Sequence, residues 1–187
     1  MTAKKPSFEV YRAADAPPYS ETSCMEYSGI TPVIEDGIVR ATAEGADDGN
    51  EVRLLFSMPG MSLTYAWFKS GFPLPLHSHN ADCLYYIIAG SLKLGTEELG
   101  PGDGFYVGSD VPYTYKPGPE GVEVLEFRTA DAFDIRFKGN TAAFWDKIVE
   151  GVRKEKPGWE GQRKPTELAG IKWAAPRCAP RCAAGRR

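Results

Sequence analysis

The chain has two histidines, and both lie in one short stretch, LPLHSHNADC, where one residue separates His77 from His79. Successive side chains of an extended segment point to opposite faces, so residues i and i+2 share a face. We therefore expect the two imidazoles to lie on one surface. Neutral imidazole is a common protein ligand for zinc, copper, iron and nickel, so the pair predicts half of a coordination shell for such a metal.

The segment that follows, ADCLYYIIAG, has the aromatic and β-branched residues of a strand and extends the same alternation. Cys83 and Tyr85 then share one face, which we expect to line a cavity together with the histidines. Tyr86 and Ile88 take the other face, where an apolar surface suits a helix or a second subunit. Asp82 is an alternative ligand only if a bulge intervenes, because a shift of one residue reverses the direction of a side chain.

Two other strands contribute candidate residues. In 62–70 the aromatic residues alternate, and we predict Trp67 as a substrate contact in the cavity, although the phase of this strand is open. In 121–128 Glu126 alternates with valines, so an inward face would make it a general base or a ligand. The alternative is an exposed edge residue paired with Arg128.

The elements that must position these residues are short strands separated by turns. Aromatic and β-branched residues dominate the strands, and Gly or Pro residues mark the breaks. Consecutive strands without helices between them indicate an all-β sandwich or barrel. The expected strands are 62–70, 81–90, 91–95, 103–109, 111–116 and 121–128.

One helix is expected after the strands, in TAAFWDKIVEGVR at 141–153. Phe144, Ile148 and Val152 recur there at four-residue spacing, and a polar side chain at 140–141 can cap the start. We expect the apolar stripe of this helix to pack on the outside of the barrel.

The chain therefore divides into three parts. Residues 1–50 are predicted as an N-terminal arm with early strands, residues 51–138 as the barrel, and residues 139–187 as the helix with a flexible basic tail. A length of 187 residues with 42% hydrophobic residues is sufficient for one domain with a sizeable core.

The composition also indicates the cellular compartment in which the protein is expected. No apolar run is long enough to cross a membrane and the N-terminus lacks a signal-peptide pattern, so a cytoplasmic protein without membrane partners is expected. The four cysteines are too few and too scattered for a disulfide framework, and we expect them to be reduced. They are Cys24, Cys83, Cys178 and Cys182.

The net charge of −3 conceals an asymmetry between the two ends of the chain. Residues 151–187 contain ten Lys or Arg against three Glu, which gives +7 there and leaves −10 for residues 1–150. The basic end is rich in Pro, Ala and Gly and lacks apolar periodicity, so a disordered or loosely draped tail is expected, with an interaction tail as the alternative. No helix with a basic face is evident, and nucleic acid is not expected as a partner.

The spacing of these residues resembles the first motif of the cupin superfamily. Gly71 is followed after five residues by His77-x-His79, then by position 83 and by Gly90. The second cupin motif resembles Pro101-Gly102-Asp103 and the run VGSDVPY at 107–113. The resemblance covers about residues 60–128.

The resemblance implies a jelly-roll β-barrel, often dimeric, in a superfamily that includes dioxygenases, isomerases, decarboxylases, lyases, sugar-binding regulators and storage proteins. Its members usually have Glu where this chain has Cys83 and a third His where it has Tyr113. Both residues are then expected near His77 and His79. The usual ligand set is therefore incomplete in this chain.

Three arrangements follow from this replacement. Cys83 can act as a thiolate ligand in a Cys-His-His site for zinc or copper, with Tyr113 or water as the fourth donor. Alternatively, two histidines and water hold iron weakly, while Cys83 and Tyr113 contact the ligands or form a thioether crosslink, as in some thiol-oxidising cupins. In the third arrangement metal binding is lost, and the cavity binds an organic molecule directly.

We therefore predict a homodimeric cupin-like protein that binds a small organic molecule in its barrel. The primary hypothesis is a metal-dependent, oxygenase-like enzyme with zinc, copper, iron or nickel on His77, His79 and Cys83. Tyr113 is the predicted catalytic group, and Tyr85, Tyr113 and Trp67 are the predicted substrate contacts. The alternative is a metal-free binding protein without catalytic activity.

Overall fold

The structure, a computed structural model, describes residues 5–171 and is built around two β-sheets. The larger sheet has the order β2-β3-β8-β5-β6, with β7 paired to β5, and the smaller sheet has the order β1-β9-β4. The strands are β1 Met25–Tyr27, β2 Asn50–Met58, β3 Met61–Phe68, β4 His77–Ser78, β5 Cys83–Leu94, β6 Glu97–Leu99, β7 Gly104–Val107, β8 Lys116–Arg128 and β9 Phe133–Phe137.

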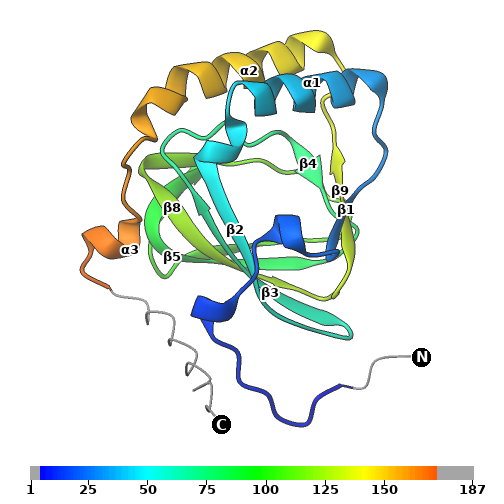
Figure 1. Ribbon diagram of the computed structural model, residues 1–187, viewed down its shortest axis with the longest axis vertical. Coiled ribbons are helices and arrows are strands. Elements are labelled where there is room, and N and C mark those ends of the chain that lie inside the picture. The colour runs from blue at the N-terminus through cyan, green and yellow to red at the C-terminus, as the bar shows by residue number, and fades with distance from the viewer. Residues whose placement is uncertain (1–4, 172–187) are drawn as a thin grey trace, which may run out of the picture.

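The sheets wrap around a common interior, and a pair of helices runs along one side of it (Figure 1). All strand pairs of the larger sheet are antiparallel. In the smaller sheet β4 and β9 are antiparallel, whereas β1 and β9 are parallel. The all-β, cupin-like barrel predicted from the sequence is confirmed.

Strand β5 shows the alternation that the sequence predicts. Cys83, Tyr85 and Ile87 are buried in the main core, whereas Leu84 and Tyr86 are exposed on the outer face. Such alternation is expected for a sheet with one face on a core and the other in water. The inward direction of Cys83 and Tyr85 is therefore as predicted.

The helices are α1 Pro32–Ala43, α2 Ala142–Glu155 and α3 Pro165–Leu168, with 3-10 turns η1 Ala13–Asp15, η2 Tyr19–Glu21, η3 Ala46–Gly49 and η4 Lys156–Gly158. Residues 1–50 were predicted to contain early strands, and they contain β1, but residues 32–43 form helix α1. Thr31 caps it by accepting a hydrogen bond from the Ile34 backbone N–H at 3.3 Å, and Pro32 occupies its first turn. Proline is favourable there because its missing N–H would be unpaired in any case.

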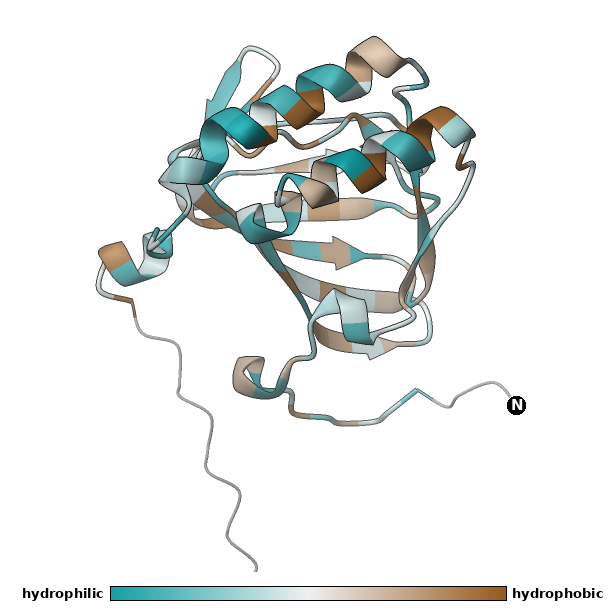
Figure 2. Ribbon diagram, turned by 45° about the horizontal axis from the view of Figure 1, so that its top comes forward, coloured by the Kyte–Doolittle hydropathy of each residue, from teal (hydrophilic) through white to brown (hydrophobic). Residues whose placement is uncertain are grey.

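Helix α2 is the helix predicted at 141–153, and Thr141 caps it. Its buried residues are Trp145, Val149 and Val152, and Ile148 lines the cavity, so the predicted stripe is confirmed at Ile148 and Val152. At its start the neighbouring Trp145 is buried and Phe144 is only half-buried. The difference arises because α2 packs beside α1 as well as over the barrel. Both helices carry hydrophilic and hydrophobic residues in alternation, as expected for amphipathic helices over a core (Figure 2).

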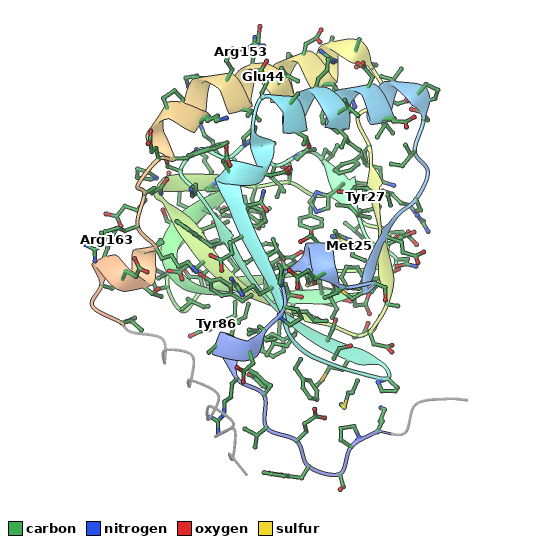
Figure 3. The ribbon with its side chains drawn as sticks, viewed as in Figure 1. Met25, Tyr27, Glu44, Tyr86, Arg153 and Arg163 are labelled. Atoms are coloured by element: carbon green, nitrogen blue, oxygen red, sulfur yellow. The ribbon has the colours of Figure 1, made fainter. Side chains whose placement is uncertain are left out.

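Two ion pairs join the helix pair on its outer side. Arg40 contacts Asp146 at 2.8 Å and Arg153 contacts Glu44 at 2.5 Å, and Glu44 and Arg153 lie close together in Figure 3. Exposed pairs of this kind contribute little to stability. The association of α1 with α2 therefore depends mainly on the buried contacts beneath the ion pairs.

Hydrogen bonds to a buried carboxylate hold the last described helix, α3, on the larger sheet. Glu123 of β8 accepts hydrogen bonds from the backbone N–H of Thr166 at 2.6 Å, from its hydroxyl at 2.9 Å and from Tyr65 at 2.6 Å. These bonds hold α3 against β8. Residues 172–187 of the predicted basic tail, with Cys178 and Cys182, lie outside the described residues. Within 5–171, no helix combines the length and the apolar character needed to cross a bilayer.

The contact between the helices gives a testable prediction at Gly37. A β-carbon at this position would lie 2.1 Å from Trp145 Cδ2, so Gly37→Ala forces the indole ring to move. Overpacking of this kind costs about 1–3 kcal/mol, more than the helix propensity that alanine contributes. Urea unfolding should show a lower free energy of unfolding for Gly37→Ala. In Gly100→Ala, where no atom lies within 4 Å, unfolding should be nearly unchanged. Equal stability of Gly37→Ala and the wild type would contradict this packing.

Candidate functional site

A cavity of about 260 Å³ lies between the sheets and beneath the helix pair. Helix α1 contributes Ile38 and Ala41 to its wall, and α2 contributes Trp145 and Val152. Both histidines line the same cavity together with polar side chains from β8 and from the loop before β8. Met25 and Tyr27 of β1 also line it, and both are labelled in Figure 3.

His77 and His79 lie together in this cavity, as predicted. Their ring centroids are 5.0 Å apart, and each Nδ1 lies 2.7 Å from a backbone carbonyl, that of Pro75 for His77 and that of Asp134 for His79. A carbonyl can only accept, so Nδ1 carries the proton in both rings. Each Nε2 therefore keeps a free lone pair. No described residue donates a hydrogen bond to either Nε2 atom.

The histidines are neutral at physiological pH. Burial lowers the pKa of His77 to about 4 and that of His79 to about 3, and the nearby positive charge of Arg128 adds to both effects. Their hydrogen bonds to backbone carbonyls act in the opposite direction and do not compensate. A neutral imidazole with a fixed tautomer is the form that binds a metal or accepts a hydrogen bond.

Backbone pairing sets the position of the histidine segment. His77 pairs with Phe137 of β9 and also forms a two-way bridge with Tyr113, at 3.2 Å and 2.9 Å. The loop after His79 is fixed by Asn80 and Asp134, each of which accepts a hydrogen bond from the other's backbone N–H. These contacts place the Tyr113 ring 4.5 Å from the His77 ring, as the motif spacing implies.

Tyr85 and Tyr113 form a buried pair of hydroxyl groups that hydrogen-bond to each other. Tyr85 also stacks on Phe105 at 4.4 Å, which fixes its ring. Burial and the negative charge of Glu126 raise the pKa of both tyrosines, so both hydroxyls stay protonated. Tyr113 lines the cavity, whereas Tyr85 lies behind it. The catalytic role predicted for Tyr113 stays a prediction.

Cys83 lies in the core behind Tyr85. Like Cys24 it is a free thiol, and burial raises its pKa to about 12, although Arg128 lowers it, so the sulfur is protonated. Within residues 5–171, no three His, Cys, Asp or Glu side chains are grouped so that they could share a metal ion. The predicted set of His77, His79 and Cys83 is therefore not assembled as a three-ligand site.

Trp67 corrects another predicted contact. It belongs to a second apolar cluster on the outer face of β3, with Tyr65 and Leu63, whereas Ala66 and Phe68 face the main core. The alternation of the strand was expected, but its phase is opposite to the one that would place Trp67 in the cavity. Trp67 does not line the cavity.

Glu126 and Arg128 form an ion pair that lines the cavity, with a separation of 2.6 Å between Oε2 and Nη1. Their exposed fractions are 6% and 3%, so the inward alternative for Glu126 is correct and the exposed edge is not. Sequence reasoning considered Arg128 only as a surface partner. The signal for an inward pair was the apolar face that Glu126 shares with the buried Val122 and Val124.

The donor set suits a transition metal only in part. Two neutral imidazoles with Nδ1–H bound to carbonyls are typical metal ligands, since such hydrogen bonds orient the ring and raise its basicity. The thiol of Cys83 and the hydroxyl of Tyr113 are both protonated, so neither adds an anionic ligand to the two neutral imidazoles. His77 and His79 would therefore hold a metal whose remaining positions are open to water or to an organic ligand.

The depressed histidine pKa values predict a pH-dependent stability. Below the unfolded pKa of about 6.5 the unfolded chain takes up protons that the folded chain does not, so stability falls as the pH falls towards the folded values of about 4 and 3. Between pH 7 and pH 5 the loss is about 2 kcal/mol per histidine. Urea unfolding of metal-free protein at several pH values should show a smaller loss in the double variant His77→Gln, His79→Gln. Parallel pH profiles would contradict the burial of neutral imidazoles.

Comparisons with known proteins find similar solved structures of low sequence identity. No family model and no curated protein matches the sequence. Among solved structures, KdgF from Halomonas sp. aligns with 17% identity and a TM-score of 0.39 over 43% of this chain and 79% of that chain. An RmlC-like cupin from Shewanella frigidimarina aligns with 20% identity and a TM-score of 0.41 over 44% and 77%.

The polyketide cyclase RemF from Streptomyces resistomycificus aligns with 19% identity and a TM-score of 0.44 over 57% of this chain and 82% of that chain. At such identities and scores, none of these similarities indicates what this chain binds. The pairing of its own strands and the placement of the histidine motif inside the barrel define the architecture. The chain has a cupin-like β-barrel fold.

Proposed function

We propose that the barrel cavity binds one small organic molecule against His77 and His79, with a divalent transition metal held by the two imidazoles. The observation that carries the proposal is the pair of neutral histidines that line one cavity and bind backbone carbonyls through Nδ1, which leaves each Nε2 free. Zinc, copper, iron and nickel suit such ligands. The molecule in the cavity would complete the shell that the protein leaves open.

The reaction that we propose for this arrangement is an oxygenase-type oxidation of the bound molecule. A redox-active metal would supply the activation of dioxygen or substrate. The protein would contribute orientation and exclusion of water, because the cavity is covered by α1 and α2. Tyr113, protonated and beside His77, would donate a hydrogen bond to an oxygen atom of the substrate.

A second candidate function is metal-free binding of the same molecule. It is favoured by the lack of a third grouped ligand among residues 5–171 and by the protonated thiol of Cys83. The two functions differ in one measurable property. A metal-free binder would be stabilised by organic ligands alone and would hold no stoichiometric metal after reconstitution.

Metal content tests the first proposal. The full chain without a histidine tag, reconstituted with zinc, iron, copper or nickel and then desalted, should hold about one ion, and His77→Ala, His79→Ala should hold close to none. Cys83→Ser is the matched control and should keep the metal, since the thiol is not placed as a ligand. Elemental analysis measures all three proteins. Equal metal in the wild type and the histidine variant, or none in either, would reject the metal site.

We also propose that the chain forms a homodimer, for which an exposed apolar face is available. On the outside of the larger sheet Leu84 pairs with Tyr106 on one side and with Phe127 on the other, and Tyr86 lies two residues along β5. All four side chains are exposed by 40% or more. Sedimentation should give twice the chain mass of 20.5 kDa, and Tyr86→Lys should shift the protein towards the monomer. A wild-type monomer at micromolar concentration would contradict the dimer.

A further inference from the structure

Three hydrogen-bond acceptors of the cavity lining have no donor among the described residues. They are His77 Nε2, His79 Nε2 and Glu126 Oε1, because each imidazole uses Nδ1 on a carbonyl and the carboxylate uses Oε2 on Arg128. The three side chains are exposed by only 4%, 6% and 6%. All three residues line the cavity, so these acceptors favour a ligand that brings hydrogen-bond donors.

The charge of the cavity disfavours an anion. Its charged lining residues are Asp47, Glu126 and Arg128, whose charges sum to one net negative charge. The Arg128 guanidinium is already used, because Nη1 binds Glu126, Nη2 lies 3.4 Å from the Tyr85 hydroxyl and the group lies over Phe133 at 4.4 Å. Its unpaired Nε is sealed among protein atoms, so a ligand in the cavity does not reach it.

The remaining polar groups of the inner cavity suit a hydroxylated ligand. Tyr113 and Tyr115 line the cavity, and a phenolic hydroxyl can both donate and accept a hydrogen bond. Aromatic side chains provide the apolar walls, with Phe68 5.4 Å from Phe72 and 5.9 Å from Tyr115 between ring centroids. Such walls favour a ring that can lie flat or edge-on against them.

We infer that this cavity selects an uncharged ring compound with two or more hydroxyl groups and rejects carboxylates, and that Glu126 is the specificity-determining residue. The inference rests on the second candidate function, metal-free binding, because it takes the Nε2 atoms of His77 and His79 as free acceptors for the ligand. Glu126 acts in two ways. Its free oxygen accepts a ligand hydroxyl, and its charge neutralises the arginine that would otherwise bind an acid.

Isothermal titration of the metal-free full chain with three probes of similar ring size tests this inference. Resorcinol carries two hydroxyl donors and is not a chelate pair, 1,3-dimethoxybenzene is its methylated form without donors, and benzoate carries a negative charge. We expect resorcinol to bind at least tenfold more tightly than either of the others. Benzoate binding as tightly as resorcinol would overturn the inference.

The substitution Glu126→Gln tests the role of this residue directly. It leaves Arg128 without its counter-charge, so resorcinol should bind about tenfold more weakly and benzoate more tightly than to the wild type. Glu120→Gln, the same chemical change at an exposed position of β8 outside the cavity lining, is the matched control and should keep the wild-type order of affinities. An unchanged order in a folded Glu126→Gln, checked by circular dichroism, would overturn the assignment.

Two further outcomes have separate meanings. If Glu126→Gln does not fold, which the loss of a buried ion pair can cause, the comparison of the three probes on the wild type still decides the ligand class. If none of the three probes binds, the inference fails, whereas the metal-content measurement still decides the proposed metal site. Binding with the wrong order of affinities rejects the inference alone.

Discussion

The hydrogen bonds from the histidine Nδ1 atoms to two backbone carbonyls are the constraint on which the site depends. They fix both imidazoles in one tautomer and leave both Nε2 atoms to the cavity. The carbonyls belong to Pro75 and Asp134, so the loop before β4 and the start of β9 must be held in place for the site to exist. The bridge to Tyr113 and the Asn80–Asp134 pair perform that task.

Burial determines the protonation of the histidines and the pairing of the charged groups in the cavity wall. The helix pair covers the cavity, and Gly37 allows α1 to approach Trp145 of α2 closely. In such a water-poor space the charged form of histidine is disfavoured, and a charge is tolerated only when it is paired. The Glu126–Arg128 pair satisfies this condition, and the same pairing removes the arginine from ligand binding.

The side chains of Cys83 and Tyr113, both predicted as site residues, are linked within the core. Tyr85 lies between them, because its hydroxyl contacts that of Tyr113 and interacts with the thiol of Cys83. Groups at both positions are protonated and take part in the core's own hydrogen bonding. In the proposed metal site only the two histidines would hold the ion, which would therefore have open positions.

The sequence by itself determined the strand alternation of β5, a polar cap at the start of α2 and the shared face of His77 and His79, because local periodicity and capping act over short distances. The position of Tyr113 beside them was implied only by the resemblance to the cupin superfamily. Tertiary structure alone decided the phase of β3, which turns Trp67 outward, and the packing of α2 against α1, which selects Trp145 as its buried residue. It also decided the inward direction of Glu126 and Arg128. A period of two allows either face of a strand to be inside, and only the packing of distant segments chooses between them.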